Sequence, residues 1–168
     1  MPAKAKTQVA DTIESCEHAR ANDWPYVCAV DLSDFLTAQE HGLVTAELRA
    51  KLDVEALTAY VLSRKGEIET SWDRERRQLE RIVSHGRGLE YEEVVLVLTL
   101  RSSLEAACRF LQEDRRRQLR EEVDEPLEQI LRENLAIVTK LQRRGSFGVD
   151  SSLPERWWWQ EGLPRERS

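Results

Sequence analysis

The residue types that most often carry catalysis are scattered along this chain of 168 residues. The histidines are His18, His41 and His85, and they fall in different segments with no HExxH pattern and no Cys/His ligand spacing. No GxSxG, Walker-type loop or GxGxxG is present, and the Gly-Arg-Gly at 86–88 is too short to cradle a phosphate. We therefore predict no catalytic residue, no metal ligand and no cofactor, and we do not expect an enzyme.

The cysteines form neither a CxxC pair nor an even framework. They are Cys16, Cys28 and Cys108. An odd count without a secretory signal indicates reduced thiols, so we expect a cytoplasmic protein. Cys28 follows Trp24 and Tyr26 and could be a reactive thiol. The favoured interpretation is a small buried hydrophobic residue.

Clustered arginines could contact a nucleic-acid backbone, because guanidinium groups match phosphate geometry. The arginines concerned are Arg74, Arg77, Arg101, Arg115, Arg116, Arg117 and Arg120. Acidic residues stand among them, the net charge is −6, and no segment is strongly basic. The simpler interpretation is a solvated, ion-paired helix surface, and a subunit of a nucleoprotein complex remains the alternative.

The C-terminal segment is the most unusual feature, because Trp157, Trp158 and Trp159 are consecutive. Consecutive side chains cannot all face one core from a helix or a strand. Exposed tryptophans are frequent anchors of protein interfaces, so we predict that these three bind a protein partner. The segment could instead fold back onto the helices, or insert at a membrane interface, which would favour a more basic neighbourhood.

The N-terminal part predicts short helices. Val9, Ile13 and Cys16 recur at helical spacing, and a helix over 7–22 should stop before Pro25. The stretch 26–30 is either an extended connector or part of the next helix, which should end at Gly42. Thr45 should then cap a further short helix.

The rest of the chain predicts longer helices. A single helix should run from Asp53 to Ser84, with a bend possible at Gly66, and a glycine-rich turn follows. The pattern from 90 to 143 predicts two helices in near-continuation about Pro126, which either kinks the chain or lies in the first turn of a new helix. The run 94–100 is apolar on every side and too short to span a membrane, and we predict a helix rather than a strand.

Together these patterns predict an all-α protein in three parts: a small helical head (1–52), a long antiparallel hairpin or coiled-coil-like bundle (53–144) and an irregular tail (145–168). Charged residues make up 33% of the chain, which is typical of exposed helices. The long helices carry more apolar surface than two helices can hide, so self-association or entry into a larger complex should follow. We expect a non-enzymatic scaffold or adaptor subunit that binds other proteins or itself.

Overall fold

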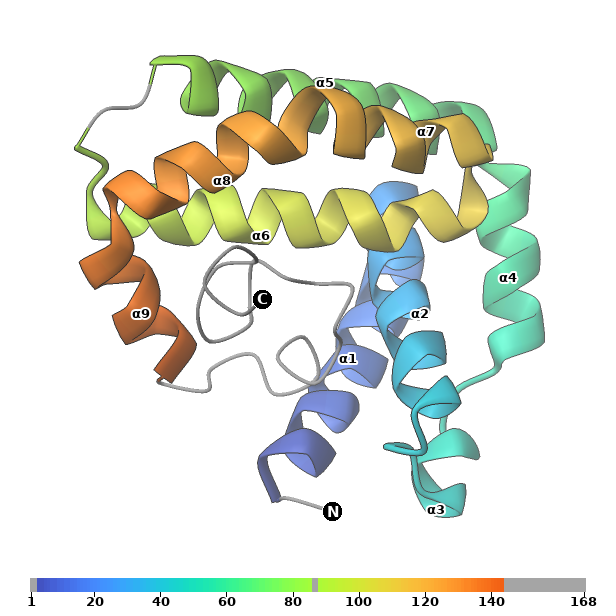
Figure 1. Cartoon of the computed structure of the whole chain (residues 1–168). Coiled ribbons are helices and arrows are strands. Elements are labelled where there is room, and N and C mark those ends of the chain that lie inside the picture. The colour runs from blue at the N-terminus through green and yellow to red at the C-terminus, as the bar shows by residue number, and fades with distance from the viewer. Residues whose placement is uncertain (1–2, 86–87, 144–168) are drawn as a thin grey trace. The chain divides into compact units, whose positions relative to one another are not determined.

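The computed structural model describes residues 3–85 and 88–143, with backbone only at 3–7, 85, 142 and 143 (Figure 1). Every regular element in these ranges is helical, which confirms the predicted all-α class. The helices are α1 (Ala3–Ala21), α2 (Pro25–Glu40), α3 (Ala46–Arg49), α4 (Val54–Ser63), α5 (Lys65–His85), α6 (Tyr91–Ala107), α7 (Glu113–Gln118), α8 (Asp124–Glu133) and α9 (Leu135–Arg143). The predicted tail, including Trp157, Trp158 and Trp159, lies outside the described residues.

Contacts divide the chain into two compact units. The first holds the described residues up to Arg74 together with Ala106–Gln112, and the second holds Glu75–Glu105 and the described residues from Glu113 onward. The first unit extends past residue 52 into α5, because Leu57, Val61 and Trp72 are buried along with the N-terminal helices.

In the first unit, α1 and α2 pack side by side as a helical hairpin (Figure 1). α1 buries Val9, Ile13, Cys16 and Ala19. α2 buries Cys28, Ala29, Leu32 and Phe35. The small Cys and Ala side chains let the two backbones approach closely. The stretch 26–30 belongs to α2, which begins at Pro25, where the missing N–H is not needed.

Two local predictions are confirmed in the connections that follow α2. Gly42 has φ 70° just past the helix end, and Leu43 N donates to Ala38 O at 2.9 Å, which closes the turn. Thr45 caps α3, since its Oγ1 accepts from Leu48 N at 3.2 Å.

The single helix predicted over 53–84 is wrong. The chain leaves helical geometry at Arg64, with φ −113° and ψ 22°, and forms α4 before it and α5 after it. The break lies two residues before Gly66, which falls in the first turn of α5. The Arg64 side chain bonds outside its own helix, to Asp23 and Glu67, and a sequence period does not reveal those contacts.

The pattern over 90–143 does not indicate two further breaks in the chain. The chain breaks at Leu111, which is extended with φ −112° and ψ 176°, and again at Asn134. Asn134 is buried, and its side-chain amide donates to Ile130 O at 2.8 Å. Pro126 lies in the first turn of α8, after a π-helical turn at Leu119–Val123, which confirms the second of the two alternatives for this proline. The run 94–100 is helical, as predicted.

Candidate functional site

The turn between α1 and α2 contains an unusual backbone conformation. Asp23 has φ 57°, and it is the one non-glycine residue with positive φ in the described ranges. Trp24 N donates to Ala19 O at 2.8 Å and Asp23 N to Arg20 O at 3.1 Å, the two bonds of a Schellman turn. Glycine usually occupies the position that Asp23 takes, because a Cβ is strained there.

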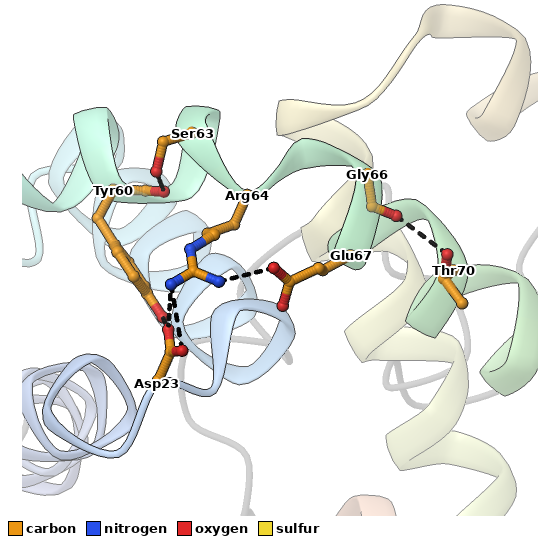
Figure 2. A network of polar contacts seen from close by, with 7 residues as sticks. All are labelled: Asp23, Tyr60, Ser63, Arg64, Gly66, Glu67 and Thr70. Atoms are coloured by element: carbon orange, nitrogen blue, oxygen red, sulfur yellow. Dashed lines mark hydrogen bonds and ion pairs between the residues drawn. The ribbon is translucent and has the colours of Figure 1, made fainter.

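Side chains from α4 and from the residue that follows it hold the Asp23 carboxylate (Figure 2). The Tyr60 hydroxyl donates to Asp23 Oδ1 at 2.6 Å, and a guanidinium nitrogen of Arg64 donates to Asp23 Oδ2 at 3.1 Å. The other terminal nitrogen of Arg64 donates to Glu67 Oε1 at 2.6 Å. One carboxylate therefore ties the α1–α2 turn to the junction between α4 and α5.

The electrostatics of this network raise the pKa of both of its donors, Tyr60 and Arg64. Burial, and then the hydrogen bond to Asp23, raise the pKa of Tyr60 to about 12, so its hydroxyl remains a donor near neutral pH. The bond to Glu67 and the charge of Asp23 raise the pKa of Arg64. The Arg64 guanidinium also lies 5.9 Å from the Tyr60 ring centroid, which is within cation–π range.

Two exposed apolar side chains follow Asp23 in the chain. Trp24 is 49% exposed and Val27, one helical turn further along α2, is 42% exposed. His18 meets the edge of the Trp24 ring, with centroids 5.5 Å apart. We call these residues the Asp23 surface: His18, Asp23, Trp24, Val27, Tyr60 and Arg64. Trp, Tyr and Arg are the residue types most enriched among the energetic hot spots of protein interfaces.

The arginines predicted to contact nucleic acid do not lie on one helix. Arg74 belongs to the first unit, and the others belong to the second. Arg74 and Arg77 are exposed on α5, and the Arg74 guanidinium lies 3.5 Å from Ser71 Oγ. The arginines of α7 and the following turn are Arg115, Arg116, Arg117 and Arg120.

Arg101 does not belong to any surface, because it is only 2% exposed. Its guanidinium donates to both carboxylate oxygens of Asp124, at 2.7 and 3.2 Å, and to Glu105 at 3.1 Å. Burial alone would lower the pKa of Arg101, but the bonds to Asp124 and Glu105 outweigh it and raise the pKa. The prediction that Arg101 contacts nucleic acid is therefore corrected: it links α6 to α8, which lie side by side (Figure 1).

The α7 arginines line a shallow depression in the second unit. Its walls are Glu113, Asp114, Arg116, Arg117 and Arg120. Arg116 also pairs with Glu105 at 3.2 Å, and Arg117 lies 4.0 Å from Glu121. The two acidic walls and these pairs offset much of the positive charge that a phosphate would need.

The two histidines whose side chains the structure describes do not lie together. His18 and His41 are exposed on separate elements, and no cluster of three or more metal-ligating side chains occurs among the described residues. Within the same residues, no helix is long and apolar enough to cross a membrane. No known protein family, curated protein or solved structure matches the chain.

Sequence reasoning missed the Asp23 surface. The sequence predicts only a helix stop at Asn22–Pro25, and it predicts Tyr60 and Arg64 within one continuous helix. One local signal is the absence of glycine at this helix end. A left-handed residue there must then be of another type, and Asp adopts the left-handed conformation most readily after Asn. The partners of Asp23 lie 37 and 41 residues away, and no sequence period connects them.

Proposed function

We propose that the protein is a non-enzymatic helical scaffold or adaptor subunit that binds another protein through the Asp23 surface. The observation that carries this proposal is the positive φ of Asp23, held by Tyr60 and Arg64 beside the exposed Trp24. Strained non-glycine residues persist where surrounding contacts demand them, and such positions concentrate at sites that bind ligands or partners.

The chemistry of the Asp23 surface suits a protein partner. Trp24 offers a large apolar ring, Arg64 a planar cation, and Tyr60 an aromatic ring whose hydroxyl is already satisfied by Asp23. Because side-chain bonds hold Tyr60 and Arg64 in place before binding, less rotamer entropy is lost when a partner docks. The surface therefore has both the residue types and the preorganisation of an interface centre.

The experiment compares two variants of the full chain in proximity cross-linking and quantitative affinity capture from the cells that make it. Trp24→Ala removes the centre of the surface, and Leu62→Ala is the matched control, since Leu62 is 55% exposed on α4 but is not part of the Asp23 surface. Circular dichroism verifies that both variants are folded. Sedimentation velocity on the same proteins shows whether the partner is a second copy.

We expect wild type and Leu62→Ala to bind the same partner, either another protein or a second copy of the chain, with equal affinity. Trp24→Ala should bind that partner at least tenfold more weakly, which corresponds to about 1.4 kcal/mol of binding free energy. A folded Trp24→Ala variant that retains every partner and the same sedimentation as wild type contradicts the proposal.

A second candidate function is a subunit of a nucleoprotein complex. The depression lined by Arg116, Arg117 and Arg120 favours it, whereas Glu113 and Asp114 on the same walls oppose it. If arginines hold nucleic acid, the purified chain should absorb near 260 nm and lose that absorbance steeply with salt. An Arg120→Gln variant should then bind a labelled RNA more weakly, and an unchanged affinity would exclude these arginines.

A further inference from the structure

Two cysteines from different helices face each other inside the first unit. Cys16 on α1 and Cys28 on α2 have sulfur atoms 3.8 Å apart, and both side chains are fully buried. A disulfide needs a sulfur–sulfur distance of about 2.05 Å, so the two atoms must approach by less than about 2 Å. Shifts of that size are within reach of side-chain rotation and a small movement of the hairpin.

The two thiols also differ in acidity. The hydrogen bond between the two sulfurs raises the pKa of Cys16 and lowers the pKa of Cys28. Burial raises the pKa of each thiol, the charge of Asp31 does the same, and Arg20 lowers the pKa of Cys28. These directions favour ionisation of Cys28 before Cys16.

We propose that Cys16 and Cys28 form a two-electron redox site, at which a hydroperoxide oxidises the two thiols to a disulfide that joins α1 to α2. The Cys28 thiolate attacks the terminal oxygen of the hydroperoxide, the O–O bond breaks, and a sulfenic acid forms. The proton that Cys28 released on ionising is taken up by the departing oxygen, which leaves as water or an alcohol. Cys16 then attacks the Cys28 sulfur, the S–O bond breaks, and water leaves with the Cys16 proton. Two thiols and hydrogen peroxide thus give one disulfide and two waters.

Access to the pair requires a local opening, because neither sulfur is exposed. Hydrogen peroxide is close to water in size, and packed helices admit such molecules during local fluctuations. The disulfide then closes the loop from residue 16 to residue 28 and restricts further opening of the α1–α2 hairpin. Dithiol and disulfide forms should therefore differ in thermal stability.

The experiment treats the folded, reduced full chain with excess hydrogen peroxide, removes the peroxide, and counts free thiols in denaturant. We expect the count to fall from three to one, since the chain has three cysteines and Cys108 has no part in the link. Trypsin cleaves after Lys6, Arg20 and Arg49, so the disulfide appears in mass spectrometry as peptide 7–20 linked to peptide 21–49. The oxidised protein should show a higher Tm, and dithiothreitol should restore the original value.

Cys16→Ala and Cys28→Ala are the controls, with circular dichroism to verify folding. Each should retain its two thiols under conditions that convert wild type, and neither should show the Tm shift. Three results would overturn the proposal: no linked peptide from folded wild type, a link that involves Cys108, or oxidation that proceeds only after the chain is unfolded in urea.

Discussion

Replacing Asp23 by glycine and by alanine tests whether contacts with α4 hold this residue in its left-handed conformation. In helices, alanine is more stable than glycine by about 1 kcal/mol. At φ 57° the order should reverse, because a Cβ is strained there and glycine is not. Both variants lose the bond from the Tyr60 hydroxyl, so they differ only in the backbone strain.

The magnitudes follow from the contacts. Loss of the Tyr60–Asp23 hydrogen bond should cost about 1 kcal/mol. Asp23→Ala keeps the backbone strain and should be about 1 kcal/mol less stable than wild type. Asp23→Gly relieves about 1 kcal/mol of strain, which offsets the lost hydrogen bond, so its stability should be near that of wild type. Gly42→Ala calibrates the strain itself, since Gly42 has φ 70° and an added Cβ would meet nothing within 4 Å.

The assay is urea unfolding of the full chain, followed by far-ultraviolet circular dichroism, for wild type and the three variants. Tyr60→Phe, alone and combined with Asp23→Ala, completes a double-mutant cycle and should give a coupling energy of about 1 kcal/mol. An Asp23→Ala variant as stable as Asp23→Gly, or a coupling energy near zero, would refute the reasoning.

Three further predictions concern stability elsewhere. Asp124→Ala removes a carboxylate that pairs with the buried Arg101 and should lower the free energy of unfolding by about 3 kcal/mol, more than Arg101→Met does. A smaller loss for Asp124→Ala, measured by chemical denaturation, would contradict a buried ion pair. Burial raises the pKa of Asp31 to about 6 from 3.8, against the opposing bond from Ser15, so wild type should lose stability as pH rises from about 4 to 6. Asp31→Asn should remove that loss, and at pH 7 it should be more stable than wild type by at most about 3 kcal/mol. Equal Tm values for the variant and wild type at pH 7 would argue against the raised pKa of Asp31. Thr45→Ala should cost about 1 kcal/mol through the lost cap on α3, measured by the same denaturation and contradicted by an unchanged midpoint.

The features that the sequence could predict are those whose causes lie within a few residues. Gly42 ends α2 because its own lack of a Cβ permits positive φ, and Thr45 caps α3 through a bond to Leu48, three residues away. The all-α class follows from helical spacing and from the scarcity of glycine and proline. The helix at 94–100 was predicted because no other segment could pair with it as a strand.

The missed features depend on partners far along the chain. Arg101 resembles the other arginines in the sequence, and only packing against Asp124, 23 residues away, buries it. Cys16 and Cys28 are too far apart for any local motif, yet the α1–α2 hairpin brings their sulfurs together. A hydrophobic period reports which face of a helix is buried, but not what it is buried against.

The two left-handed turns of the first unit show most directly which features the sequence determines and which need the tertiary structure. Gly42 and Asp23 both have positive φ, 70° and 57°, at the ends of consecutive helices. The glycine alone determines the first turn, because no other residue adopts that conformation so readily. Only the tertiary structure decides the second, because the strain at Asp23 is tolerated through bonds to Tyr60 and Arg64 that form once α4 has packed against α2.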